Sequence, residues 1–150
     1  MLEKPDLKDE KIIACLQDEY GLCIAQIAFL PLGADVNTAV YRVVADNEIP
    51  YFVKLRMDNI EETSVTLPKF LNDSGIQNII APITTKTGQL WTDLEVLKLI
   101  LYPFVDGRNG YKIEMSDHHW LELGAALNRI HTLEIPLSII ISRSRRQYLE

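Results

Sequence analysis

Apolar residues recur at helical spacing near the start of the chain, over residues 8–20. A spacing of three or four places these side chains along one face of a helix. We therefore expect an amphipathic helix there, with Asp6 or Asp9 as its N-cap and Gly21 as its end.

Three β-favouring runs follow, at residues 22–30, 39–45 and 51–56. Residues 33–38 are too polar and too glycine-rich for a strand interior, so they predict the turn at the tip of an antiparallel hairpin. Backbone N–H groups and the side chains of Asn37 and Thr38 in such a tip can meet phosphate oxygens. Most glycine-containing turns only join strands, so this feature is weak evidence by itself.

A second helical pattern covers residues 59–73 and contains Pro68. Proline inside a helix removes a hydrogen bond and clashes with the preceding turn. Either this helix is kinked, or a separate helix begins with Thr66 as its cap.

Further apolar runs lie at residues 79–84, 90–91 and 96–105, with a turn at Thr87-Gly88. Counting five strands in all, we predict an α+β fold, a five-stranded antiparallel sheet with helices.

A polar break at residues 106–110 precedes the last predicted helix, residues 116–131. One face of this helix carries Trp120, Leu123, Leu127 and His131. We expect His131 to be a hydrogen-bonded packing residue. His118 and His119 are adjacent and point in different directions on a helix, so we expect no metal site there.

Composition narrows the function classes without naming a function. With 150 residues, 47% of them hydrophobic, the chain can form one globular domain with a real core. The net charge of -6 argues against a broad nucleic-acid surface, and no apolar run approaches the roughly 18 residues of a membrane span. We expect Cys15 and Cys23 to be buried thiols, and the protein to be cytoplasmic with small-molecule partners.

Lys54 is the main candidate for chemistry because it is a charge inside an apolar run. In a strand over residues 51–56 it would lie on the face opposite Val53 and Leu55, where burial is costly without an anionic partner. The alternative is a lysine at a sheet edge that reaches solvent. Protein-kinase-like enzymes have the same order of features: a turn, then a strand lysine, then a helix glutamate, here Glu61 or Glu62. Acidic residues are also favoured at a helix start because of the helix dipole alone.

The order of motifs resembles the aminoglycoside phosphotransferase family, and most closely its spectinomycin (aminoglycoside 9-) branch. The resemblance runs from about residue 8 to about residue 136 and rests on Gly33-Ala34-Asp35-x-Asn37, Tyr51-Phe52-x-Lys54-Leu55, Asp73-Ser74-Gly75-Ile76, Tyr102-Pro103-Phe104 and Trp120-x-x-Leu123-Gly124-x-x-Leu127-x-x-Ile130-His131.

This resemblance implies ATP or GTP with Mg²⁺ as the cofactor of the whole enzyme. It implies that Lys54 binds the α- and β-phosphates and that Glu62, with Glu61 in reserve, is its ion-pair partner. The turn that contains Gly33, Asp35, Asn37 and Thr38 would cover the phosphates.

The resemblance also implies a hinge at residues 102–105 that holds the purine. Such a hinge offers one backbone carbonyl and, two residues later, one backbone N–H. Proline lacks only the N–H, so Pro103 can supply the carbonyl and Val105 the N–H.

The sequence departs from the family in one large respect. The resemblance implies a catalytic aspartate in a His-x-Asp motif, with a nearby asparagine and a second, metal-binding aspartate, but no His-x-Asp occurs here. We therefore expect a nucleotide-binding lobe at residues 1–105, a linker at 106–115 and the start of a second lobe at 116–150. We expect neither catalytic nor metal-binding residues in this stretch.

The leading hypothesis is the N-terminal part of a kinase that phosphorylates a hydroxyl of an aminoglycoside or aminocyclitol and so gives antibiotic resistance. A sibling kinase for choline, homoserine or a thiosugar stays open, as does a non-catalytic fragment that only self-associates. The apolar helix face predicts a dimer through residues 116–141.

Overall fold

The chain divides into two compact units, Met1–Glu61 with Ala81–Phe104, and Glu62–Ile80 with Val105–Glu150. A computed structural model describes residues 3–32, 35–57, 59–108, 110 and 112–139. The functional division after residue 105 stays a prediction.

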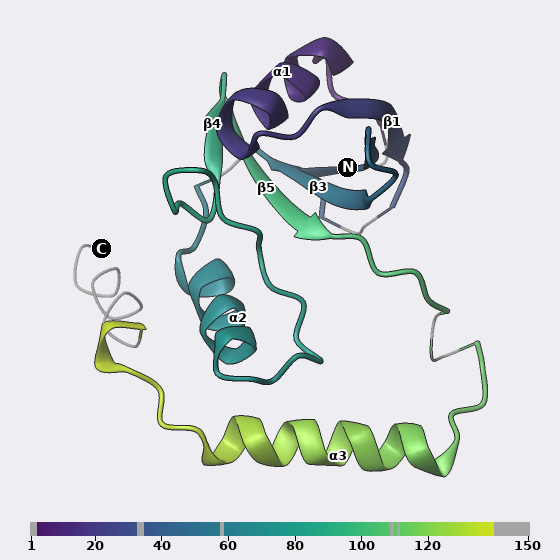
Figure 1. The fold of residues 1–150 in the computed structure, drawn as a ribbon, viewed down its shortest axis with the longest axis vertical. Coiled ribbons are helices and arrows are strands. Elements are labelled where there is room, and N and C mark those ends of the chain that lie inside the picture. Colours follow the sequence, from purple (N-terminus) through teal and green to yellow (C-terminus); the bar gives the residue numbers. More distant parts are fainter. Residues whose placement is uncertain (1–2, 33–34, 58, 109, 111, 140–150) are drawn as a thin grey trace. The chain divides into compact units, whose positions relative to one another are not determined.

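The first unit is built on a five-stranded antiparallel sheet in the order β1-β2-β3-β5-β4 (Figure 1). Its strands are β1 Ile24–Leu30, β2 Thr38–Ala45, β3 Pro50–Arg56, β4 Thr92–Leu94 and β5 Leu97–Pro103. The predicted α+β class, with its five-stranded sheet, is therefore confirmed.

The predicted total of five strands is right, but two of the predicted apolar runs differ from the observed strands. Residues 79–84 form no strand, and only Ile83 joins β5, donating its N–H to the Leu101 carbonyl at 2.8 Å. The short strand predicted at 90–91 lies at Thr92–Leu94 instead, because Glu95, at φ 57°, makes the tight turn into β5. Apolar runs this short do not fix their own boundaries.

Helix α1, Asp9–Tyr20, covers one face of the sheet (Figure 1). The predicted cap is wrong: the N-cap is Lys8, which makes no side-chain capping bond, and Asp9 lies in the first turn, where a carboxylate suits the helix dipole. Gly21 ends the helix as predicted. It adopts φ 71°, and the N–H groups of Gly21 and Leu22 donate to the carbonyls of Gln17 and Leu16 at 3.0 and 3.2 Å.

The core of the first unit lies between α1 and that face of the sheet. Alternate residues of β2, β3 and β5 point into it, as the period of two requires. Its fully enclosed members, each with 0% exposure, are Ile12, Leu16, Tyr41, Val43, Val53, Leu99 and Leu101. The side chains on the other face of the sheet do not belong to this core and are available for binding.

The second unit contains α2, Thr63–Asp73, with Pro68 inside a single helix. Thr66 is not a cap, because its backbone N–H and its hydroxyl both donate to the Glu62 carbonyl at 2.8 Å. The separate second helix is therefore wrong, and the predicted start at residue 59 is four positions early.

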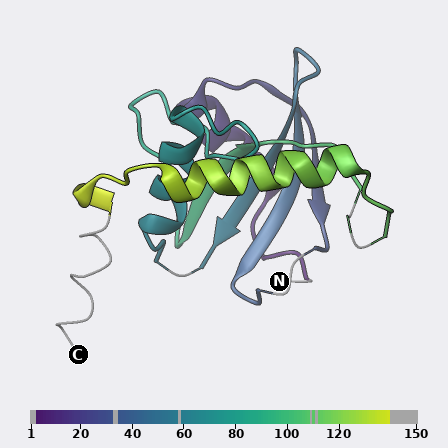
Figure 2. The same ribbon diagram turned by 90° about the horizontal axis from the view of Figure 1, so that it is seen from below.

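The last helix, α3, Asp117–Thr132, runs without a break and is the green-to-yellow helix of Figure 2. Ser116 is its N-cap, and its hydroxyl accepts a hydrogen bond from the backbone N–H of His119. The Ser116 backbone N–H donates in turn to the His119 ring nitrogen Nδ1 at 3.1 Å, which completes a capping box. His131 is exposed, so its predicted packing role is wrong. The helix packs on α2 through a small cluster: Leu67, Phe70, Leu71, Ile76, Ile79, Ala126, Ile130 and Leu133.

The two cysteines differ in exposure. Cys15 is half-buried, while Cys23 is exposed, so the prediction of two buried thiols is wrong for Cys23. No helix among the residues described is long and apolar enough to cross a membrane.

Candidate nucleotide site

Lys54 lies on the sheet face that points away from the α1 core. Its neighbours Val53 and Leu55 are buried in that core, so the predicted alternation is confirmed. β3 is the central strand, and Lys54 pairs in register with Val40 on β2 and Ile100 on β5. Lys54 is therefore not an edge-strand residue, and its aliphatic stem is flanked by two buried apolar side chains.

This position makes the ammonium group costly to keep charged. Burial lowers the pKa of Lys54, and the nearby Arg56 guanidinium lowers it further, while Asp35 acts in the opposite direction. An anion bound beside Lys54 would offset both unfavourable effects. The site therefore favours a negatively charged ligand on this face of the sheet.

The turn before β2 is organised by the Asp35 carboxylate. Asp35 accepts from the Asn37 N–H at 3.0 Å and from the Thr38 hydroxyl at 2.7 Å. The Thr38 hydroxyl and the Asn37 N–H, with a smaller effect of Arg56, lower the pKa of Asp35. The carboxylate therefore stays ionised at neutral pH and holds the turn in shape.

The same turn is tied to the end of β3. The Met57 N–H donates to the Asn37 carbonyl at 3.0 Å, and Arg56 Nη2 lies 3.9 Å from Asp35 Oδ2. Because Thr38 is buried and its hydroxyl donates to Asp35, Thr38 supports the turn in this conformation. Gly33 lies outside the described residues, and the phosphate contacts expected of Asp35, Asn37 and Thr38 stay predictions.

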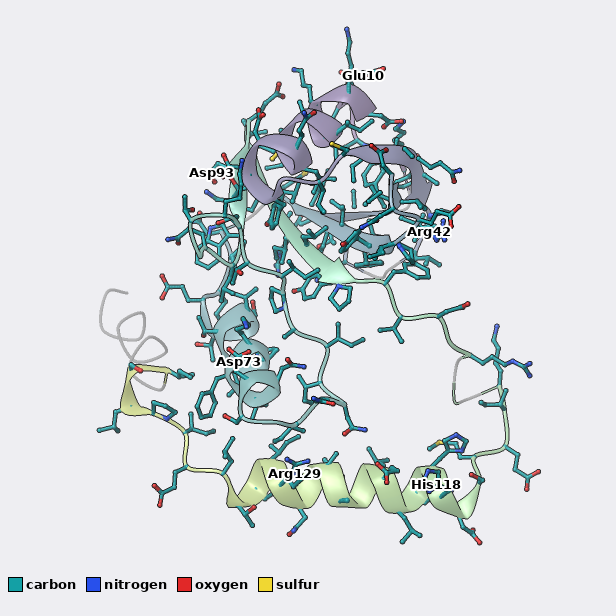
Figure 3. The ribbon with its side chains drawn as sticks, in the orientation of Figure 1. Glu10, Arg42, Asp73, Asp93, His118 and Arg129 are labelled. Atoms are coloured by element: carbon teal, nitrogen blue, oxygen red, sulfur yellow. The ribbon has the colours of Figure 1, made fainter. Side chains whose placement is uncertain are left out.

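The predicted hinge lies at the end of β5. Pro103 is the last residue of that strand and pairs with Tyr51 of β3. The next residue, Phe104, has the Arg42 guanidinium 5.1 Å from its ring centroid, and Figure 3 labels Arg42 on the sheet. The division between the two units falls between Phe104 and Val105, inside the predicted hinge.

The pairing of Lys54 with Glu62 stays a prediction. Glu62 is the N-cap of α2 and exposed, and it belongs to the second unit, whereas Lys54 and the reserve candidate Glu61 belong to the first. Within the described ranges, no group of three or more His, Cys, Asp and Glu side chains could hold a metal ion.

Sequence reasoning missed the other cations on the Lys54 face. Arg42 on β2, Arg56 on β3 and Lys98 on β5 share that face by alternation and register. Arg56 follows Lys54 by two residues, so the period of two that placed Lys54 was also the signal for Arg56.

This arrangement of strand, turn and helix is found in solved kinase structures. Spectinomycin phosphotransferase, APH(9)-Ia, in complex with ADP and spectinomycin, superposes with a TM-score of 0.82 at 32% sequence identity over 90% of this chain. The resemblance predicted from the sequence is confirmed. The chain is similar to the N-terminal part of spectinomycin phosphotransferase, and its sheet and helices match the kinase-like N-terminal lobe of that enzyme.

Two further structures agree. The AMP-bound complex of the same enzyme gives a TM-score of 0.76 at 30% identity over 89% of this chain and 40% of the enzyme. Amicoumacin kinase hAmiN, in complex with AMP-PNP, Ca²⁺ and Ami, gives 0.61 at 14% identity over 86% of this chain and 42% of that one, which shows a shared fold alone.

The chain spans only 41% of the spectinomycin phosphotransferase that it matches with ADP and spectinomycin. No protein-family model matches the chain, and neither does a curated protein sequence.

Proposed function

We propose that this chain is the nucleotide-binding part of a small-molecule kinase. The nucleotide, ATP or GTP with Mg²⁺, would bind on the Lys54 face of the sheet. Its base would lie at the hinge, against the Pro103 carbonyl and the Val105 N–H, and its α- and β-phosphates would contact Lys54. The observation that carries the proposal is a partly buried lysine on the central strand, flanked by apolar side chains and beside a carboxylate-stabilised turn.

The turn and the helix start complete the proposed site. Residues Gly33, Asp35, Asn37 and Thr38 would cover the phosphates with backbone N–H groups. Glu62, or Glu61 in its place, would pair with Lys54 and hold its ammonium group toward the α- and β-phosphates. The resemblance to the aminoglycoside phosphotransferase family supports each of these roles.

We propose an aminoglycoside or aminocyclitol, of the spectinomycin kind, as the acceptor of the whole kinase. The support is the similarity to an enzyme solved with ADP and spectinomycin. Phosphorylation of a hydroxyl on such an antibiotic would give resistance. A sibling kinase for choline, homoserine or a thiosugar is the alternative, because the same nucleotide-binding lobe would serve it.

These 150 residues contain no His-x-Asp motif, so the proposal assigns them nucleotide binding and not phosphoryl transfer. The proposed compartment is the cytoplasm, in keeping with two free cysteines.

We also propose self-association through the exposed face of α3, within residues 116–141. Trp120, Leu123 and Leu127 are 58%, 44% and 46% exposed, which is unusual for large apolar side chains that are close together on one helix. Residues 140–141 lie outside the described part of the chain.

Calorimetric titration of the chain with Mg·ATP tests the proposal, with Mg·GTP and adenosine titrated in parallel. The proposal predicts saturable binding at one site, tighter for the triphosphates than for adenosine. Binding that is equal for adenosine and the triphosphates would refute the phosphate-binding role of the Lys54 face.

A further inference from the structure

Arg56 is a partly buried cation with one donor, its Nε, that has no hydrogen-bond partner in the described part of the chain. Its side chain is 23% exposed, and its Nε is buried without a hydrogen-bond partner there. Its contact with Asp35 Oδ2, at 3.9 Å, lies at the outer limit of an ion pair. Buried polar groups are rarely left without a partner, so this donor points to a ligand.

The other cations on this face are already engaged. Arg42 lies over the ring of Phe104, and Lys98 pairs with Asp93 on β4. Within the described part of the chain, Asp35 is the carboxylate that acts on the charge of Lys54 and lies beside Arg56, and it already accepts two hydrogen bonds from its own turn. Lys54 and Arg56 therefore leave a local excess of positive charge, although the chain as a whole carries -6.

The register of β3 gives the positions of Lys54 and Arg56 relative to the predicted hinge and the turn. Tyr51 pairs with Pro103 at the hinge, where the base would bind. Arg56 pairs with Thr38 at the opposite end of the strand, beside the turn. Two residues of a strand span about 6.6 Å, so the Cα atom of Arg56 lies that much farther along β3 from the hinge end than the Cα atom of Lys54 does.

We propose that Arg56 is a second phosphate-binding residue, which contacts the terminal phosphate of a nucleoside triphosphate beyond the phosphates held by Lys54. This inference rests on the proposed nucleotide-binding function. A guanidinium group suits the role because its planar donors bind two phosphate oxygens at once and stay charged at any physiological pH. Asp35 would hold the guanidinium in place in the absence of nucleotide.

The test compares ATP, ADP and AMP, with Mg²⁺, on the full chain and on Arg56→Gln. A charged hydrogen bond to the terminal phosphate predicts that Arg56→Gln weakens ATP binding by about 10-fold or more. The weakening should be smaller for ADP and absent for AMP. Arg56→Lys should recover part of the ATP affinity, because the charge returns without the planar donors.

Lys98→Gln is the matched control, because it removes a cation from the same face that already has a carboxylate partner. It should change ATP affinity less than about 3-fold. The thermal unfolding midpoint of each variant shows whether a loss of binding is caused by unfolding. If Arg56→Gln does not fold, the comparison of Arg56→Lys with the original chain still tests the role of Arg56.

The outcomes separate the two proposals. Equal affinity of the original chain and Arg56→Gln for ATP, or equal weakening for ATP and AMP, overturns the role of Arg56 and leaves the nucleotide site standing. Displacement of bound nucleotide by inorganic tripolyphosphate, lost in Arg56→Gln, supports the role without any contribution from the base. A chain that binds neither ATP nor tripolyphosphate overturns both proposals.

Discussion

Replacing Lys54 by methionine should weaken nucleotide binding and leave the fold intact. Methionine keeps an unbranched stem between Val40 and Ile100 and deletes only the charge. Because burial lowers the pKa of Lys54, its charged form already opposes folding at neutral pH. We therefore expect the free energy of unfolding to stay within about 0.5 kcal/mol of the original value or to rise.

Alanine at the same position is a poorer probe. It removes three methylene groups, which contribute about 0.8 kcal/mol each when fully buried. Since Lys54 is half-buried, Lys54→Ala should lower stability by about 1 kcal/mol. A loss of binding in that variant would mix an effect on the fold with an effect on the ligand, and Lys54→Met avoids this.

Loss of a charged hydrogen bond to phosphate weakens the free energy of binding by about 1.5–3 kcal/mol. Lys54→Met should therefore raise the Kd for Mg·ATP by about 10-fold to 150-fold. Calorimetric titration measures the Kd, and urea unfolding of the same samples measures stability. Unchanged affinity in a folded Lys54→Met variant would refute the role of Lys54. A large loss of stability would instead refute the claim that its charge opposes folding.

Three further predictions follow from burial and exposure. Leu99→Ala should lower the free energy of unfolding by about 2–5 kcal/mol, because Leu99 is fully buried, whereas Val96→Ala, at an 81% exposed position, should change it by less than about 0.5 kcal/mol in urea unfolding. Burial, with Glu19 and Asp18 nearby, raises the pKa of Cys15 from 9.0 to about 11. Unfolding therefore releases a proton above pH 9, and this contribution to stability should be complete below pH 9 and disappear toward pH 11. In unfolding at stepped pH, Cys15→Ala should lose less stability than the original chain between pH 9 and pH 10; above pH 10 both chains lose stability, because burial also raises the pKa of Tyr20 and Tyr41. Trp120→Glu should shift sedimentation toward the monomer while Glu122→Gln does not, and a monomeric original chain at high concentration would count against α3 association.

The sequence correctly predicted the sheet face on which Lys54 lies, because successive side chains of a strand must alternate between the two faces. Once Val53 and Leu55 are assigned to the core, Lys54 must lie on the other side. The end of α1 was equally readable, since Gly21 adopts a positive φ that other residues rarely tolerate.

Boundaries and caps were predicted less well, because several residues compete for one role. Asp6 and Asp9 both suit a cap, yet Lys8 takes the position without a side-chain bond. Thr66, which also suits a cap, instead donates its hydroxyl to the carbonyl four residues earlier inside α2.

The site itself depends on hydrogen bonds that no sequence pattern specifies. Thr38 was predicted to meet phosphate, which stays a prediction, and in the structure its hydroxyl donates to Asp35. That choice depends on the backbone path of the turn. The pairing of Lys54 with Glu62 joins residues from two units and stays a prediction.

The central claim is that nucleotide binds on the Lys54 face of the sheet with its base at the hinge. Backbone amide NMR of the chain, with and without saturating Mg·ATP, tests this claim most directly. We predict shifts concentrated at residues 35–38, at residues 54–56 and at Val105, with the α1 face of the sheet unchanged. Shifts confined to α1 and β4, or none at millimolar nucleotide, would contradict it.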